Sequence, residues 1–418
     1  MRKIKVKGDK VIWLMVIIFA MISVVAVFSS STYRANAMGV EKTTIFFEQL
    51  KYVAIGFIFL LFFYLIPLGW YRALAFLFFG FTTALLVMTF IPHFQVKMNG
   101  AIRGVRLFGV SFQVFEMAKI GLIMYLAKAV EFWQDSLDTM KDFAIKLLLP
   151  IGVTCLLVMA NSFSTAILFG LISFLLLWVM GINYKYLLMS IGGTAAVVLL
   201  MFGIYGAFYA GKPESEGDKG AIEKLFNRFG TVEHRLSSYV AEIKGADKIE
   251  EEAMTKEQIQ AELDNKRQSE NAKVAISQGG IIGKGPGKST QRYSLSMAFS
   301  DFIFAFIVEE YGLLGGTIVI LLYVMFLFRC IRIGIKCQTP FSGALVLGLG
   351  FLIAIQAMLH IYVNVRLLPI TGHTLPLISH GGTAYIVLSA AFGIILSVSK
   401  QLDKQEAAQK ISEDTANE

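Results

Sequence analysis

The sequence predicts an all-α polytopic membrane protein with ten transmembrane helices and one large extracytoplasmic loop between helices 7 and 8. Of its 418 residues, 56% are hydrophobic and only 16% are charged, and the mean hydropathy is +0.64. Apolar runs of about 18 or more residues recur, which is typical of membrane helices because lipid offers unpaired backbone amides no partner. This composition excludes a soluble globular protein, and no nucleic-acid partner is expected.

The predicted spans are residues 11–30, 48–67, 72–92, 110–129, 143–161, 163–181, 185–209, 300–328, 342–363 and 380–399. The first follows a basic start, and Ala35-Asn36-Ala37 imitates a signal-peptide cleavage site. Its apolar core is longer than the roughly 7–15 residues of a signal peptide, so we interpret it as an uncleaved anchor.

The distribution of basic residues predicts the orientation. Five of the first ten residues are basic, which indicates a cytoplasmic N-terminus. With ten spans, Arg72, Lys185, Arg329 and Lys400 fall on the same side, and the even count returns the C-terminus to the cytoplasm.

These spans divide the chain into four predicted parts. Residues 1–209 hold the cytoplasmic N-terminus and helices 1–7, and 210–298 form the large extracytoplasmic loop. Residues 299–400 hold helices 8–10 with a re-entrant-like outer loop at 364–380, where Pro369, Gly372 and Pro376 interrupt helix. Residues 401–418 form a cytoplasmic tail.

The short outer loop 92–110 contradicts the charge rule. It carries Lys97, Arg103 and Arg106 and no acidic residue. One interpretation is simple tolerance of a few charges. The other is an anionic ligand such as a phosphate, which a guanidinium group binds through two parallel hydrogen bonds.

The large outer loop contains two recognisable segments. Residues 249–273 are rich in helix formers and opposite charges four residues apart, which predicts a solvated helix. Residues 279–289, GGIIGKGPGKS, are glycine-rich around Lys284 and Lys288. Ile282 stands where a nucleotide-binding P-loop needs glycine, so that reading is rejected. A pyrophosphate site on exposed loop amides and a purely structural loop remain alternatives.

Three carboxylates lie in or beside an apolar helix, in SMAFSDFIFAFIVEEYGLLGG (296–316). On a helix Glu309 lies about 12 Å from Asp301 and about 80° round the axis, with Glu310 almost opposite Asp301, so they cannot share one face. An ionisable residue at membrane depth predicts a functional site. The alternative for Asp301 is a helix cap.

The C-terminal motif resembles that of a known family. Its pattern is an Asn followed by P-x-T-G-x-x-L-P-x-x-S-x-G-G-S, and the chain supplies Asn364, Pro369, Thr371, Gly372, Leu375, Pro376, Ser379, Gly381 and Gly382, with Thr383 for the last Ser. This pattern resembles the SEDS family (shape, elongation, division, sporulation), and the resemblance covers about residues 11–400.

Other family motifs recur with departures. NGAIR (99–103) keeps the family's N-G-A-x-R, but Gly104 replaces the usual Trp. QVFEMAK (113–119) resembles Q-P-S-E-x-x-K through Gln113, Glu116 and Lys119, with Val114-Phe115 in place of Pro-Ser. Residues 160–166 correspond to Q-P-D-x-G-T-A and keep only the final Thr-Ala. Arg228 and Arg235 resemble the paired arginines of the outer loop.

The resemblance implies a peptidoglycan glycosyltransferase of the division branch, with the rod-shape branch as runner-up. Such enzymes polymerise lipid II into a nascent glycan strand at the outer face of the cytoplasmic membrane, beside a class B penicillin-binding protein and other divisome membrane proteins. Asp301 corresponds to the family's essential Asp and is predicted to be the general base. The residues predicted to bind substrate are Arg103, Glu116, Lys119, Arg228, Arg235, Lys284, Asn364, Thr371 and Ser379.

The roles of two residues and the presence of a metal cofactor stay open. We expect Glu309 and Glu310 to organise the cavity or to pair with Lys119. No residue is predicted as a metal ligand, although Mg²⁺ or Mn²⁺ sharing the diphosphate charge remains an alternative.

Two other functions fit a ten-span protein with a polar cavity. One is a lipid II flippase, and the other is a non-catalytic scaffold for the penicillin-binding protein. Asp301 and the basic loop are predicted on the same side, which favours one-sided chemistry over alternating access. A scaffold predicts that Asp301 is dispensable.

Overall fold

The fold is a bundle of long helices, shown by a computed structural model that describes residues 7–98, 101–107, 110–137, 139–208, 256–295 and 298–416. The first half of the bundle contains α1 (Lys10–Ser30), α2 (Thr32–Met38), α3 (Lys42–Leu65), α4 (Leu68–Met88), α5 (Val114–Trp133), α6 (Met140–Phe143), a π-helical turn (Ala144–Leu148), α7 (Leu149–Met159), α8 (Phe163–Val179) and α9 (Tyr184–Phe208). The second half contains α11 (Lys256–Gly279), α12 (Ile303–Lys336), α13 (Pro340–Asn364) and α14 (Thr383–Ala416).

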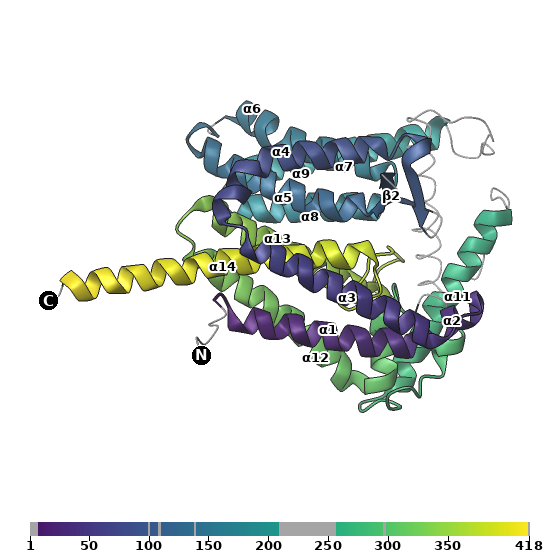
Figure 1. Ribbon diagram of the computed structural model, residues 1–418. Coiled ribbons are helices and arrows are strands. Elements are labelled where there is room, and N and C mark those ends of the chain that lie inside the picture. The colour runs from purple at the N-terminus through teal and green to yellow at the C-terminus, as the bar shows by residue number, and fades with distance from the viewer. Residues whose placement is uncertain are drawn as a thin grey trace.

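The structure confirms a polytopic all-α membrane protein. In the described part of the chain, seven helical segments are long and apolar enough to cross a membrane, namely α1, α3, α4, Met140–Met159, α12, α13 and α14. Helix α8 is apolar but has only 17 residues. Each predicted span overlaps a helix, and the count of ten crossings stays a prediction. The predicted tail is largely a continuation of α14, which extends beyond the bundle (Figure 1).

A small antiparallel sheet, which the sequence did not predict, occupies the basic loop between α4 and α5. Its strands are β1 (Gln95–Met98), β2 (Ala101–Leu107) and β3 (Val110–Phe112), in the order β1-β2-β3. Val96 pairs with Gly104 and Lys97 with Ile102, so Arg103 is the extra residue of a β-bulge. A Cβ atom at Gly104 would lie 2.5 Å from the carbonyl oxygen of Phe112, which explains why this chain has no side chain there.

Helix α13 lies at the centre of the bundle, with α12 and α14 beside it and α5 and α8 on its other side (Figure 1). Small residues allow these close approaches. A Cβ atom at Gly348 would lie 2.5 Å from the side chain of Ile123 in α5, and one at Gly350 would lie 2.7 Å from Cys330 in α12. Close backbone approach at small residues is the usual way in which membrane helices pack.

Helix α1 is joined to α12 at both ends. At its start, Asp9 caps the helix and accepts a hydrogen bond of 2.9 Å from Nε of Arg329. Near its end, the Ser29 hydroxyl donates to Oε1 of Glu310 at 2.6 Å. From Val11 to Ser29 α1 carries no charged residue, and the distance along the helix between the two contacts is about 30 Å.

Helix α12 is interrupted at Gly312, whose backbone is not helical (φ 69°, ψ −172°). The amides of the next two residues donate to the glycine-rich loop instead of to their own helix. Leu313 N–H donates to the carbonyl of Gly280 at 2.9 Å, and Leu314 N–H donates to that of Ile281 at 3.2 Å.

The carbonyls on the other side of the interruption bond to the same loop. The carbonyl of Glu309 accepts from Lys284 N–H at 3.0 Å, and that of Glu310 accepts from Gly285 N–H at 2.9 Å. In an unbroken helix these carbonyls would accept from the two amides after Gly312. Residues 280–285 are therefore inserted into the hydrogen-bond ladder of α12, and all four backbone groups keep a partner.

This insertion explains the glycine pattern. A Cβ atom at Gly279 would lie 2.1 Å from the carbonyl oxygen of Val308, and one at Gly283 would lie 2.3 Å from that of Glu310. Side chains at these positions would separate the two backbones and break the exchanged hydrogen bonds.

We expect Gly283→Ala to lower the melting temperature of the purified protein much more than Gly287→Ala. Both glycines have positive φ, +90° and +73°, so alanine costs about 1 kcal/mol at each for backbone strain. Only at Gly283 does the new methyl group also collide with backbone, since nothing lies within 4 Å of the Gly287 position. Equal melting temperatures for the two variants would contradict the inserted-loop geometry.

Candidate active site

Asp301 lies in a turn directly before α12, at residues 298–302, and its side chain is partly exposed. The position that caps α12 is held by Phe302. The side chain of Asn364, at the end of α13, holds this turn on both sides. Its Nδ2 donates to the carbonyl of Asp301 at 3.0 Å, and its Oδ1 accepts from Ala305 N–H at 2.9 Å. Asn364 is fully buried, so it fixes the backbone that carries the carboxylate.

The connection between α13 and α14 holds the same turn from another direction. The Ser379 hydroxyl donates to the carbonyl of Ser300 at 2.8 Å. The backbone N–H of His380 donates to the carbonyl of Phe299 at 2.9 Å. Three successive carbonyls, at 299, 300 and 301, are thus bonded to residues of the C-terminal motif.

This connection is itself anchored deep in the bundle. The Tyr323 hydroxyl of α12 donates to the carbonyl of Pro376 at 2.5 Å, and the Ser23 hydroxyl of α1 donates to that of Ile378 at 2.8 Å. Both donors lie well inside their helices, so the loop folds back between the spans.

The His380 ring belongs to a buried polar chain. Its Nδ1 is 2.7 Å from Oε1 of Gln49, so Nδ1 carries the proton, and Gln49 Nε2 donates to the Ser23 hydroxyl at 2.7 Å. The ring also makes edge contacts with Tyr52 and Phe299. Burial, with a smaller contribution from the charge of Arg34, lowers the pKa of His380 to about 4, so the ring is neutral at pH 7.

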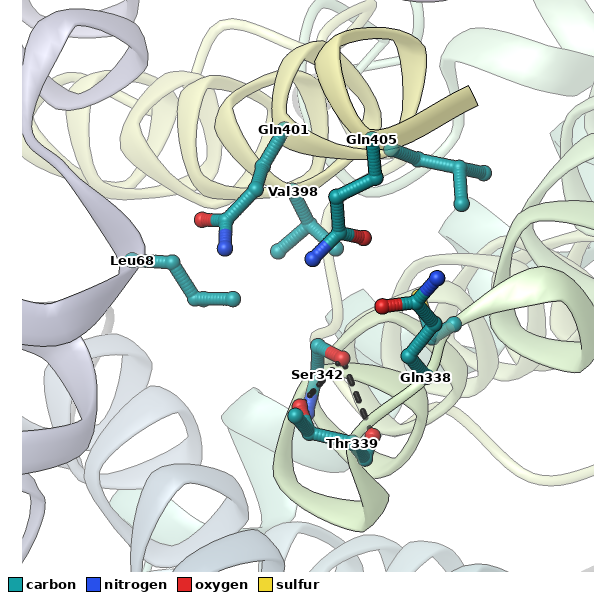
Figure 2. Close-up of a pocket in the computed structure, with 9 residues that line it drawn as sticks. Leu68, Gln338, Thr339, Ser342, Val398, Gln401 and Gln405 are labelled. Carbon is teal, nitrogen blue, oxygen red and sulfur yellow. Dashed lines mark hydrogen bonds between the residues drawn. The ribbon is translucent and has the colours of Figure 1, made fainter. Parts of the chain in front are cut away.

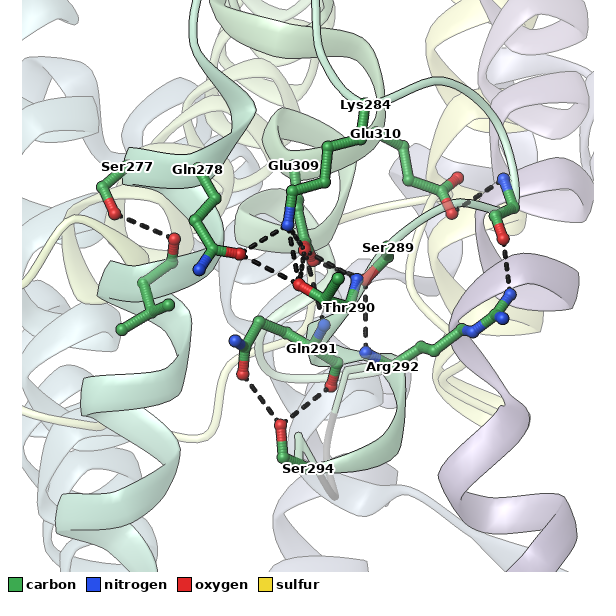
Figure 3. A network of polar contacts seen from close by, with 12 residues as sticks. Ser277, Gln278, Lys284, Ser289, Thr290, Gln291, Arg292, Ser294, Glu309 and Glu310 are labelled. Carbon is green, nitrogen blue, oxygen red and sulfur yellow. Dashed lines mark hydrogen bonds and ion pairs between the residues drawn. The ribbon is translucent and has the colours of Figure 1, made fainter.

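Glu309 is clasped by the glycine-rich loop (Figure 3). It is fully buried, and its Oε1 accepts from Lys284 Nζ at 2.8 Å and from both the N–H and the hydroxyl of Thr290 at 2.8 and 2.9 Å. The hydroxyl of Ser289 donates to its Oε2. Glu310 accepts from Gly287 N–H at 2.9 Å and from α1. The prediction that these acids pair with Lys119 is wrong, because the inserted loop supplies their partners.

The loop amides are also occupied. Those of residues 283, 284, 285, 287 and 288 all donate to protein acceptors. The geometry therefore favours the structural reading of the glycine-rich segment over an open anion cradle. Lys284 as a substrate contact stays a prediction, since its ammonium group bonds to Gln278, Thr290 and Glu309 here.

Lys119 lies at the start of a second polar cluster. It is 2% exposed, and its Nζ donates to Oε1 of Glu116 and to Oε1 of Gln356 of α13, both at 2.7 Å. Gln356 in turn donates to the carbonyl of Thr374 at 3.2 Å. The cluster connects α5 and α13 to the same loop that holds the Asp301 turn.

A cavity of about 60 Å³ opens beside this cluster. Its lining comes from the start of α5, the α7–α8 turn and the α13–α14 loop, and consists of Gln113, Phe115, Glu116, Ser162, Thr165, Thr371, Gly372, His373 and Thr374. Ser162 stands where the family motif has its Asp. Among the described residues, Oε2 of Glu116 and the hydroxyl of Thr371 are buried without a hydrogen-bond partner. The cavity thus presents polar atoms suited to a polar ligand.

A smaller cavity of about 20 Å³ lies at the other end of the bundle (Figure 2). It is lined by amides and hydroxyls from Gln338, Thr339, Ser342, Gln401 and Gln405, with no carboxylate or ammonium group. Along α13, Ser342 and Asn364 are separated by about 33 Å. This cavity is therefore remote from Asp301 and lacks its chemistry.

The predicted site residues fall into three groups. Asn364 and Ser379 meet at the Asp301 turn, and Glu116, Lys119 and Thr371 meet at the 60 Å³ cavity. Lys284 lies apart, with Glu309. Arg228 and Arg235 lie outside the described residues, as does the side chain of Arg103. Within the described ranges no three His, Cys, Asp or Glu side chains gather as a metal site, and Mg²⁺ or Mn²⁺ stays an alternative.

Sequence reasoning missed the polar residues that support these groups, namely Ser23, Gln49, Gln356 and His380. A signal was available, because polar side chains inside apolar spans are costly and mark interior positions. It did not indicate which of them would meet.

We expect acid to destabilise the protein partly through His380. Its pKa is about 4 in the fold and about 6.5 when unfolded. The neutral ring therefore makes its full contribution to the free energy of unfolding above about pH 6.5. This contribution, roughly 3 kcal/mol in total, is lost as the pH falls toward 4. The drop in melting temperature between about pH 7.5 and pH 5 should be smaller for His380→Gln than for the unmodified protein. Equal drops would rule out this contribution.

Comparisons with known proteins agree with this fold. Residues 9–213 and 253–404 match the FtsW/RodA/SpoVE family model, described as cell cycle protein. The probable peptidoglycan glycosyltransferase FtsW of Enterococcus hirae is 27% identical over 409 residues, covering 96% of each chain. The Bacillus subtilis (strain 168) protein of the same name is 29% identical, covering 92% of this chain and 89% of that relative.

Solved structures show the same architecture. A chain of a peptidoglycan synthase complex that coordinates polymerization and crosslinking superposes with a TM-score of 0.68, at 19% identity, over 94% of this chain and 98% of that one. The rod shape determining protein RodA of Thermus thermophilus gives a TM-score of 0.62, also at 19% identity, over 94% and 97%. The chain belongs to the FtsW/RodA/SpoVE family of cell cycle proteins, the family whose motifs the sequence carries.

Proposed function

We propose that the chain is a peptidoglycan glycosyltransferase that polymerises lipid II into glycan strands during septal wall synthesis. The observation that carries this proposal is the Asp301 turn, a partly exposed carboxylate at the end of a span whose backbone is held by Asn364 and Ser379. FtsW relatives that align along nearly the whole chain support the same activity.

In this mechanism Asp301 is the general base. A hydroxyl of the acceptor sugar gives its proton to the carboxylate while its oxygen attacks the anomeric carbon of the donor. The bond from that carbon to the diphosphate breaks in the same displacement, so the configuration inverts and undecaprenyl diphosphate leaves. A base needs a fixed position, and the three bonded carbonyls at 299–301 supply one.

Cationic groups are needed where the diphosphate departs. We assign this role to Arg103, Arg228 and Arg235, with the cavity beside Glu116 and Lys119 holding polar parts of the substrate. The Lys119 ammonium is already neutralised by Glu116, so it orders this wall of the cavity. A divalent cation would share the diphosphate charge.

The proposal includes topology and partners. The termini lie in the cytoplasm, and the Asp301 turn faces the outside, where lipid II and the growing strand meet. A class B penicillin-binding protein crosslinks the product. The similarity to a chain of a peptidoglycan synthase complex supports assembly of this kind.

We expect Asp301→Asn to reduce lipid II polymerisation at least about 100-fold, because it removes the base and keeps the size of the side chain. The main-chain carbonyl that binds Asn364 is unchanged, so the fold and partner binding should persist. The measurement is glycan formation from labelled lipid II by the purified protein with its cognate class B penicillin-binding protein.

The matched control is Asp264→Asn on the exposed face of α11, which should polymerise normally. An active Asp301→Asn enzyme would overturn the catalytic assignment. Failure of even the unmodified complex to make glycan would favour a flippase or a scaffold.

We expect Lys119→Met to destabilise the protein by about 3 kcal/mol, because it leaves Glu116 as an uncompensated charge in a largely buried site. The double variant Lys119→Met/Glu116→Gln should recover most of the melting temperature and still polymerise poorly. A single variant as stable as the unmodified protein, or a fully active double variant, would argue against this role of the pair.

A further inference from the structure

The tip of the glycine-rich loop exposes two large apolar side chains. Ile281 is 68% exposed and Ile282 is 78% exposed. They adjoin Leu313 and Leu314 of α12, because the backbone at 280–281 bonds directly to the amides of these leucines. Both leucines are also more than half exposed, so the four side chains form one apolar surface, which we call the loop-tip patch.

The patch continues a face of α12 that faces lipid. Ile318 and Leu321, the next exposed large apolar residues along α12, are 56% and 58% exposed. They lie inside a helix that is apolar and long enough to span a membrane. Helical residues exposed at that depth contact hydrocarbon.

Helix α1 indicates where the hydrocarbon ends. Its two polar contacts to α12, Asp9 with Arg329 and Ser29 with Glu310, lie about 30 Å apart, which is the thickness of a bilayer core. Gly312 is about 26 Å from Arg329 along α12. Glu310 marks the edge of the hydrocarbon core. The exchanged backbone contacts at 313–314 therefore lie about one helical turn deeper in the membrane than this edge.

The backbone of the loop tolerates this depth. Hydrocarbon favours amides and carbonyls that are bonded within the protein. The insertion into α12 satisfies the carbonyls of residues 280 and 281 and the amides of 284 and 285, and the amide of Gly283 donates to the carbonyl of Gly279 within the same segment. Residues after the tip have interfacial character. Lys288 is exposed, and the Arg292 guanidinium stacks over the exposed Tyr293 ring at 4.7 Å. Aromatic and cationic residues are typical of the headgroup region.

We propose that residues 280–283 dip into the acyl chains of the bilayer leaflet nearest Glu310, so that this loop is a membrane anchor for α11. Continuity with the lipid-facing side of α12 and the depth set by α1 favour lipid over a protein partner. The inference does not depend on the proposed enzymatic activity.

The test is spin-label depth measurement on the full chain in liposomes without any partner. Single Cys variants Ile282→Cys, Ile318→Cys and Lys288→Cys are made in a parent in which Cys155, Cys330 and Cys337 are replaced by alanine. Collision of the label with oxygen, which dissolves in hydrocarbon, is compared with collision with a water-soluble nickel chelate. The oxygen-to-nickel ratio at Ile282 should approach that at Ile318 and exceed that at Lys288 several-fold.

A ratio at Ile282 equal to that at Lys288 would overturn the proposal. It is the result expected if the patch binds a protein partner, because without that partner the patch would face water. Ile281→Cys provides a second reading at the same tip. Ile282→Cys lies at an exposed position, so its label should not disturb the fold.

Discussion

The backbone exchange at Gly312 is the constraint on which the outer half of the molecule depends. A helix inside a membrane cannot leave its amides and carbonyls unpaired, yet α12 opens its ladder there. It does so because residues 280–285 supply the missing donors and acceptors. The side chains of Glu309 and Glu310 are buried beside this insertion, at 0% and 1% exposure. The loop supplies the Lys284 ammonium to Glu309, whereas Glu310 accepts from Gly287 N–H of the loop and from Ser29 of α1.

The C-terminal motif acts on the candidate base through the backbone. Asn364, Ser379 and His380 do not present a row of side chains to a ligand; they bond to the carbonyls of the turn that carries Asp301. Behind them, Gln49 joins the His380 ring to α1. Four segments distant in sequence therefore determine the position of one carboxylate, which is the requirement that a general base has to meet.

Much of the fold could be predicted from the sequence, because apolar runs separated by charged segments determine membrane helices almost alone. The sheet β1–β3 could not, since its strands are three to seven residues long and lack a clear alternating pattern. The glycines in the segment at 279–287 indicate that another group approaches the backbone closely. A bound phosphate and a packed protein carbonyl both require such glycines, so the sequence pattern does not distinguish the two. Asp301 was identifiable because a carboxylate beside an apolar span is costly. Its supports came from α3, α13 and the last loop, and local sequence does not show which distant segments meet.

The inserted loop also has a mechanical consequence. The connection consists of four backbone hydrogen bonds and a partly buried ion pair, in a segment where added methyl groups would collide, so we expect it to be rigid. The loop that follows α11 is thereby bonded to the first turns of α12, close to the interruption at Gly312. We therefore expect a displacement of α11 to move Asp301, which lies about three helical turns before Gly312, instead of being absorbed by a flexible hinge.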